Sequence, residues 1–166
     1  MILLLCSPPL AADDFANEYK IKAGYLYNFT KFITWPEHDA TTFNLCILGS
    51  DPFGILIDAI EKKTVKDRPI RVLRLNGFDQ KIHCHIIFTG TAEGRVKNLT
   101  SQHGSIKTLT VGESQDFAAQ GGMIGFVNRE GRIKLQINPD AIRQGGLKIS
   151  AKLLEVAEIL RSTGHE

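Results

Sequence analysis

The stretch that most constrains the fold is a predicted β-hairpin near the end of the chain. Residues 123–127 (MIGFV) form a short apolar run, and residues 128–131 (NREG) have turn chemistry. Residues 132–138 then alternate apolar and polar side chains, the apolar ones being Ile133, Leu135 and Ile137. This alternation predicts a strand with one buried face, at or near the edge of a sheet.

Helix signals follow the hairpin. Asn138-Pro139-Asp140 predicts the start of a short helix, which Gly145-Gly146 ends. Ser150 predicts the start of a final helix. The apolar face of that helix, which we expect to pack on the sheet, consists of Ile149, Leu153, Val156, Ala157 and Leu160.

Strands alternate with helices in the rest of the chain. We expect strands at residues 43–48, 69–75, 85–89 and 108–111. We expect helices at residues 18–34, 52–62, 92–102 and 115–119. This order predicts an α/β fold, a single-domain layered sandwich whose mostly parallel sheet ends in an antiparallel C-terminal hairpin, with helices on both faces.

Length and charge limit the class of protein. The 166 residues are enough for one well-buried core and too few for two ordinary domains. A hydrophobic share of 43% and a charged share of 23% are typical of a globular protein. The net charge of +2 gives no reason to expect a nucleic-acid partner or an acidic membrane surface.

Residues 1–12 (MILLLCSPPLAA) have the pattern of the end of a secretory signal peptide, an apolar run followed by two prolines and small residues. We expect cleavage after Ala12, which leaves residues 13–166 as one domain. The alternatives are a start further upstream or no signal, because a positively charged leading region is lacking. The run is shorter than the ~20 apolar residues of a membrane-spanning helix, so we expect no membrane insertion. We do not expect lipid attachment at Cys6, because the preceding Leu5 is bulky.

Two cysteines, Cys46 and Cys84, remain in residues 13–166, and an even number in an exported protein suggests a disulfide. The predicted strands at 43–48 and 85–89 are neighbours in a doubly wound sheet, where adjacent strands lie ~4.8 Å apart and a disulfide can form. The alternative is a pair of buried free thiols whose positions do not match.

The motifs that would indicate an enzyme or a cofactor site are weak. Residues 49–54 (GSDPFG) fit neither the dinucleotide fingerprint nor the P-loop. His83 and His85 share one face of a strand, while Cys84 points to the other face, so the three do not converge on a metal ion. Without a triad, paired carboxylates or a nucleophile elbow, we expect no catalysis, no metal and no cofactor.

Several stretches together resemble the YfiR family of small periplasmic proteins. The resemblance runs from about residue 19 to residue 160. The stretches are 22–32 (KAGYLYNFTKF) followed by Trp35-Pro36, 46–49 (CILG), 51–54 (DPFG), 84–88 (CHIIF), 109–111 (LTV), 117–118 (FA), 121–124 (GGMI), 137–138 (IN) and 146–154 (GLKISAKLL).

The resemblance implies a non-enzymatic periplasmic regulator. Such a protein binds the periplasmic sensor domain of an inner-membrane diguanylate cyclase and holds the cyclase inactive, and its release raises cyclic di-GMP and favours biofilm formation. The resemblance also implies a possible homodimer and sensitivity to redox conditions through disulfides. Cys46 and Cys84 match one cysteine pair of the family, but no later cysteines are present for a second pair. The alternative function is a periplasmic small-ligand sensor, with a pocket at the carboxyl ends of the strands near Gly49 and Gly90.

The predicted partner contacts are aromatic residues that the core does not use, together with one glycine turn. The first predicted helix has an apolar arc that we expect to pack on the sheet, and Tyr27 lies outside it. We therefore expect partner contacts from Tyr27 first and Trp35 second. The turn at Gly121, Gly122 and Met123 is a further candidate, because its bare backbone allows close approach. The arc consists of Ile21, Tyr25, Leu26, Phe29, Phe32 and Ile33.

Overall fold

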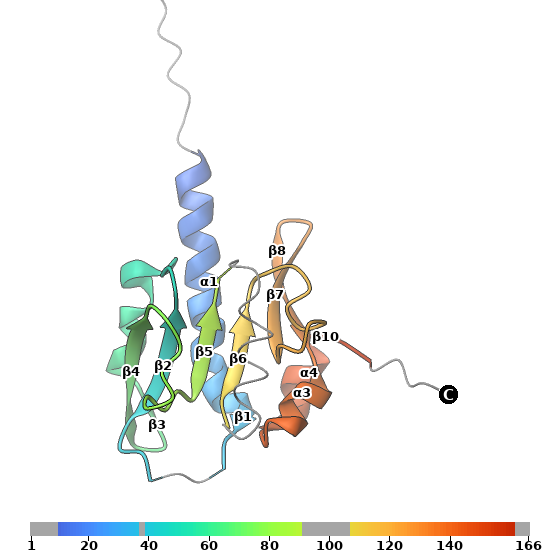
Figure 1. Ribbon diagram of the computed structural model, residues 1–166. Coiled ribbons are helices and arrows are strands. Elements are labelled where there is room, and N and C mark those ends of the chain that lie inside the picture. The colour runs from blue at the N-terminus through green and yellow to red at the C-terminus, as the bar shows by residue number, and fades with distance from the viewer. Residues whose placement is uncertain (1–9, 37–38, 91–106, 162–166) are drawn as a thin grey trace, which may run out of the picture.

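The computed structural model describes residues 10–36, 39–90 and 107–161. Within these residues one eight-stranded sheet runs through the molecule, and the long helix α1 (Leu10–Phe32) lies across one face of it (Figure 1). The strands of this sheet are β2 (Phe43–Leu48), β3 (Thr64–Val65), β4 (Arg68–Leu75), β5 (Ile86–Thr89), β6 (Leu109–Gly112), β7 (Ile124–Arg129), β8 (Arg132–Ile137) and β10 (Glu158–Ile159). Their spatial order is β10-β8-β7-β6-β5-β2-β4-β3.

The sheet is mostly parallel, as predicted. The neighbours β4, β2, β5, β6 and β7 run parallel, whereas the C-terminal hairpin β7–β8 and the short hairpin β3–β4 are antiparallel. The strand order reverses between β2 and β5, the position whose carboxyl ends form the ligand crevice in doubly wound folds. A separate antiparallel pair, β1 (Ile33–Thr34) with β9 (Lys148–Ile149), connects the end of α1 to the C-terminal region.

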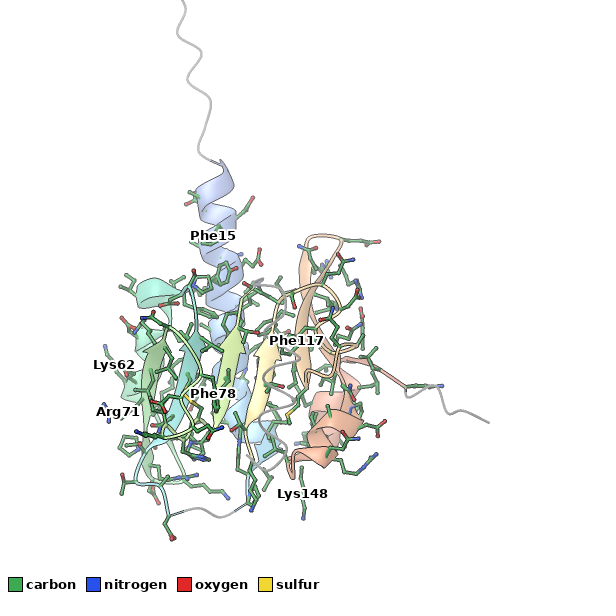
Figure 2. All side chains as sticks on the ribbon, viewed as in Figure 1. Phe15, Lys62, Arg71, Phe78, Phe117 and Lys148 are labelled. Carbon is green, nitrogen blue, oxygen red and sulfur yellow. A yellow bond between two sulfur atoms is a disulfide. The ribbon has the colours of Figure 1, made fainter. Side chains whose placement is uncertain are left out.

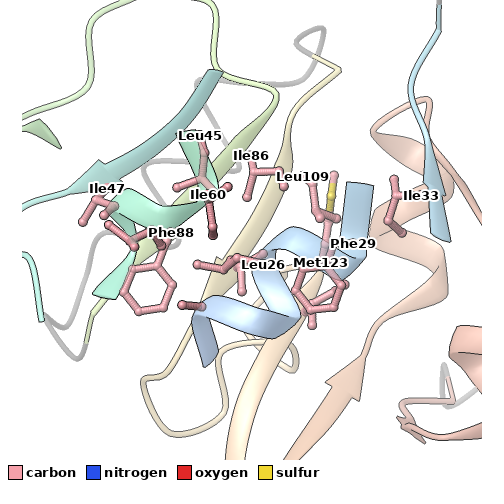
Figure 3. Packing of buried hydrophobic residues seen from close by; sticks show 14 of the residues in the cluster. Leu26, Phe29, Ile33, Leu45, Ile47, Ile60, Ile86, Phe88, Leu109 and Met123 are labelled. Carbon is pink, nitrogen blue, oxygen red and sulfur yellow. The ribbon is translucent and has the colours of Figure 1, made fainter. Parts of the chain in front are cut away.

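The main core lies between the sheet and α1 (Figure 3). Alternation along β2 points Leu45 and Ile47 toward this face, where they cluster with Leu26 and Phe29 of α1. The predicted face of β8 joins the same core, with Leu135 and Ile137 buried and Ile133 partly buried. Three shorter helices add one buried side chain each, Ile60 from η2 (Asp58–Lys62), Ile142 from α3 (Pro139–Gln144) and Leu153 from α4 (Ala151–Glu155).

The opposite face of the sheet has a smaller apolar cluster. Its buried residues are Cys46, Leu48, Cys84 and Ile87. Side chains such as Phe78 and Ile82, from the segment that connects β4 to β5, pack against this cluster. The predicted helix at 92–102 lies outside the described residues, so the described helices with buried side chains all belong to the core on the α1 face.

The turn between β6 and β7 covers part of this opposite face with Phe117, which is 1% exposed. A Cβ atom at Gly112 or at Gly122 would come within 2.2 Å of the Phe117 ring. The ring therefore fits only because both flanking positions are glycine, and the turn is held against the sheet by this contact.

Of two further predicted helices, the one at 52–62 is present only as 3-10 helix and the one at 115–119 is absent. The segment 52–62 forms two 3-10 helices, η1 (Gly54–Leu56) and η2, and Gly54 has a φ of 52°. The segment 115–119 is a turn, and Asp116 has a φ of 61°. The positive φ of Asp116 is incompatible with a right-handed helix at 115–119, whereas Gly54 is itself the first residue of η1 and the two 3-10 helices are separated at Ile57.

The first and last helices also differ from prediction. The first begins at Leu10 and ends at Phe32, because the next two residues pair as β1. The last begins as predicted after Ser150, which accepts a hydrogen bond from Lys152 N–H, but it ends at Glu155. The chain then forms β10 beside β8, and Val156 is 67% exposed, so the predicted apolar face does not extend to Leu160.

The predicted disulfide is present. Cys46 of β2 and Cys84, just before β5, are bonded with a Cα–Cα distance of 5.9 Å. Strands β2 and β5 are neighbours, as the prediction required, and both cysteines are buried on the face opposite α1. The bond closes a loop between residues that are 38 positions apart.

A buried charged cluster connects α1 to the carboxyl end of β6. Lys22 Nζ donates to Glu113 Oε2 at 2.5 Å and to Glu18 Oε1 at 2.5 Å. The Tyr19 hydroxyl donates to both Glu113 oxygens, at 3.0 and 3.1 Å. The side chains of Lys22 and Glu113 are only 5% and 7% exposed. Burial and the neighbouring Glu113 carboxylate raise the pKa of Tyr19 above its ordinary value, so the phenol stays protonated as the donor.

We predict that this disulfide stabilises the fold substantially. Closing a loop of this length contributes about 4 kcal/mol on the chain-entropy model, so reduction should lower the Tm by about 10 °C. Denatured protein lacking residues 1–12 should show no reactive thiol before reduction and two afterwards. Two reactive thiols before reduction would contradict the bond.

We predict a large cost for breaking the buried charged cluster. Glu113→Gln removes the buried counter-charge of Lys22 and leaves only the more exposed Glu18, so it should lower the free energy of unfolding by about 3 kcal/mol in urea titration. Replacing both partners, as in Lys22→Met with Glu113→Leu, should restore much of that loss. The control is Glu158→Gln, which breaks the exposed pair with Arg129 and should change the stability little. Equal effects of the two glutamine variants would show that burial does not set the cost.

Candidate functional site

A cavity of about 310 Å³ lies at the carboxyl end of β6. The hairpin β7–β8 extends past the end of β6, since only the first two residues of β7 pair with that strand. The segment that follows β6 then forms the facing wall. The lining residues are Glu113, Ser114, Gln115, Asp116, Phe126, Val127, Asn128, Arg129 and Gln136.

The lining of this cavity is mainly polar, and its shape is fixed from two sides. Glu113 is held by the Lys22 cluster, and Arg129 forms two hydrogen bonds of 2.9 Å with Glu158 of β10. Asp116 adopts a φ of 61°, which is uncommon for a residue with a side chain. Carboxylate, amide and hydroxyl groups at one place can orient a small polar ligand by hydrogen bonds. Sequence reasoning missed this cavity, although Lys22 on an otherwise apolar helix face was a signal for a buried acidic partner.

The predicted pocket near Gly49 and Gly90 is not where this cavity lies, although the two places are close. A Cβ atom at Gly90 would be 3.6 Å from Glu113 Oε1. The loop at 49–54 satisfies its own backbone, because Asp51 Oδ1 accepts hydrogen bonds from the N–H groups of Phe53 and Gly54. Asp51 Oδ2 accepts from Arg74 at 2.7 Å. The amides that a phosphate would require are therefore already bonded to a carboxylate.

The histidines at the start of β5 are part of the packing at the other end of the sheet. The rings of His83 and His85 lie 4.6 Å apart, and His85 stacks on Phe43 at 4.4 Å. His85 Nδ1 accepts a hydrogen bond from Asn44 N–H at 3.1 Å. Cys84 is in the disulfide, so its sulfur is neither a thiolate ligand nor a nucleophile. Across residues 10–36, 39–90 and 107–161 no group of three or more His, Cys, Asp or Glu side chains could hold a metal ion.

Tyr27 lies at the surface of α1, partly buried beside the β3 edge of the sheet. Lys31 Nζ is 4.6 Å and Lys63 Nζ is 4.9 Å from the centre of its ring. Two ammonium groups therefore contact one aromatic ring, an arrangement that cation–π attraction stabilises. The ring is also packed against the main core cluster, as Tyr25 and Phe32 of the predicted arc are, so Tyr27 is not separate from the core. Ile21 was predicted to belong to the buried arc, and that prediction is wrong, because its side chain is 42% exposed.

The other predicted contact residues are mostly buried. Trp35 is 9% exposed, packs edge-on against Phe43 and donates its indole N–H to the His85 carbonyl at 2.9 Å. Met123 is 8% exposed, and Gly122 is buried against the Phe117 ring. Gly121 is partly exposed. The turn at 121–123 leads into β7, whereas Tyr27 lies near β3, and four strands separate β7 from β3 in the sheet. Tyr27 and the turn therefore do not form one surface.

Comparison with known proteins gives a family and a fold. No curated protein sequence matches the chain at a significant level. None of the described helices is long and apolar enough to cross a membrane.

The structure is similar to the crystal structure of a conserved domain protein from Vibrio cholerae O1 biovar El Tor str. N16961, with a TM-score of 0.57 and 11% sequence identity. The similarity covers 86% of this chain but only 60% of that one, so it supports the fold alone. A family model described as YfiR/HmsC-like matches residues 19–158, and the chain therefore belongs to the YfiR/HmsC-like family.

Proposed function

We propose that this protein is a periplasmic regulator that binds the sensor domain of an inner-membrane diguanylate cyclase and keeps the cyclase inactive. The observation that carries this proposal is the family match over residues 19–158, since the family supports a regulator of the diguanylate cyclase kind. Release of the protein would raise cyclic di-GMP and favour biofilm formation. The disulfide between Cys46 and Cys84 is consistent with export to the periplasm.

The proposed mechanism requires binding and no chemistry. A protein that prefers the inactive conformation of its partner shifts the equilibrium toward that conformation. Changing a 1:99 balance to 99:1 takes about 5.5 kcal/mol of differential affinity, which a few well-placed aromatic contacts supply. Tyr27 is the best placed of the predicted contacts, because its ring is partly exposed and two lysines contact it. Gly121 contributes exposed backbone, whereas Trp35, Gly122 and Met123 would act through the shape of the segments that they support.

We predict that Tyr27→Glu relieves repression while the protein stays folded. The carboxylate places a negative charge where the partner would meet an aromatic ring, and Tyr27→Ala removes the ring without adding charge. Both variants should raise cyclic di-GMP in cells, because the affinity for the partner should fall. If the ring contributes about 1.4 kcal/mol, the affinity falls about tenfold.

Tyr27→Phe is the matched control, since it keeps the ring and both lysine contacts and should repress as the unchanged protein does. Near-ultraviolet circular dichroism checks the fold of each variant. Full repression by folded Ala and Glu variants would remove Tyr27 from the interface.

A small-ligand sensor is the second candidate function, and the cavity beside β6 is the observation that favours it. Its volume of about 310 Å³ suits a small metabolite, and its carboxylate and amide groups suit a polar one. Binding at this cavity could alter the position of α1, because Glu113 in its lining is hydrogen-bonded to Lys22 of that helix.

We predict that a polar metabolite of the right shape raises the Tm of the protein, and that Asp116→Gly abolishes this shift. Glycine accepts the φ of 61° at position 116 without strain, so the variant should keep its own Tm while losing a carboxylate from the cavity. Asp67→Gly is the matched control, because Asp67 has a φ of 63° and lies outside the cavity lining. A screen of polar metabolites in which no compound shifts the Tm would count against the sensor function.

A further inference from the structure

A cluster of basic residues lies at one lateral edge of the sheet. Residues 61–71 (EKKTVKDRPIR) contain five basic and two acidic residues, so this segment has a net charge of +3, more than the +2 of the whole chain. Figure 2 shows Lys62 and Arg71 projecting from this edge, while Lys148 lies elsewhere. We define the basic edge by its exposed members, which are Lys31, Lys62, Lys63, Lys66 and Arg71.

The positive charges of the basic edge are not neutralised within the described part of the chain. The salt bridges found there involve Lys22, Arg74, Arg129 and Arg143, and none involves a member of the basic edge. Of the two acidic residues in the segment, Glu61 accepts a hydrogen bond from Val72 N–H at 2.8 Å, and Asp67 lies in the β3–β4 turn. Lysines do protect edge strands from pairing with other chains. That role does not explain why two of them meet on the ring of Tyr27.

We propose that the basic edge docks the protein on a bilayer surface of anionic phospholipids. The charges lie along the rim of the sheet on both of its faces, because Lys63 contacts Tyr27 on the α1 face, while Arg71 points to the opposite face, between the buried Ile70 and Val72. A planar layer of phosphate groups can meet such a rim without a groove. An acidic peptide would need a groove or a free strand edge, but β3 offers only two residues, and beyond it the N–H groups of Ile70 and Val72 in β4 are already bonded to Lys63 and Glu61.

The residue types fit a lipid surface better than a specific acidic partner. Four of the five members of the basic edge are lysines, which act as point charges and attract phosphates without the bidentate geometry that arginine provides. Clusters of four to eight basic residues are typical of anionic-lipid binding. Tyr27 adds an amphipathic ring of the kind that lies at headgroup level. Docking of this kind would concentrate the protein in the plane where a membrane-bound partner lies.

The test is co-flotation of the disulfide-bonded protein with vesicles. We expect binding to vesicles of phosphatidylglycerol mixed with phosphatidylcholine, no binding to phosphatidylcholine alone, and release at about 1 M salt, where the Debye length is about 3 Å. Lys62→Gln with Lys66→Asn should weaken binding about 25-fold, since each basic residue near an anionic surface contributes about fivefold. Asparagine suits the φ of 48° at position 66, so this variant should fold at least as well as the unchanged protein.

The matched control is Lys148→Gln with Lys152→Gln, which removes the same charge from two other exposed lysines and should weaken binding far less. Equal losses in the two double variants, or no binding to the anionic vesicles, would overturn the proposal. Loss of repression in cells by a Lys62 and Lys66 variant that still binds vesicles normally would also overturn it, and would indicate an acidic protein partner. Tyr27 is unchanged in both double variants, so these outcomes are distinguishable from a failure of the proposed cyclase contact.

Discussion

The buried ion pair between Lys22 and Glu113 is the interaction on which the arrangement of the domain depends. It joins residues that are 91 positions apart, one on α1 and one just after β6. Two charges that are 5% and 7% exposed are favourable only when each is paired and hydrogen-bonded, and the Tyr19 hydroxyl and Glu18 complete those bonds. The pair therefore specifies where α1 lies along the sheet, which hydrophobic contacts alone would leave less defined. It also fixes one wall of the cavity beside β6, so the position of the helix and the shape of the cavity are coupled.

Much of the fold could be predicted because its signals are local. Asn138 caps the helix as expected, with its side-chain oxygen accepting from Ala141 N–H at 3.0 Å. Alternation identified β8, and continuous apolar runs identified β2 and β5. One error occurs where a single residue overrides the pattern, as Asp116 does with its positive φ, and another where a predicted helix forms as two short 3-10 helices. The strand β10 could not be predicted, because its two residues become a strand only by pairing with the edge of β8.

The candidate site was less predictable than the fold, for a physical reason. A cavity is made by segments that meet in space, and here the segment that begins at Glu113 meets a hairpin that begins at Ile124 on a neighbouring strand. Sequence spacing does not encode that meeting. The burial of a side chain also depends on the whole fold. Trp35 donates its indole N–H to a backbone carbonyl and is part of the core. From the sequence alone, an aromatic residue after a helix was an equally good candidate for the surface.

The disulfide defines how redox conditions can act on this protein. Cys46 and Cys84 are 0% and 2% exposed and are the cysteines of residues 13–166, so a thiol reagent reaches the bond only when the face opposite α1 opens. Reduction would therefore lower the stability of β2 and β5 together before it changed any surface side chain. The carboxyl ends of these two strands flank the point where the strand order reverses, and β5 leads through β6 to Glu113. Reduction would thus affect the cavity and the Lys22–Glu113 ion pair by destabilising the sheet. It would not act directly on a binding surface.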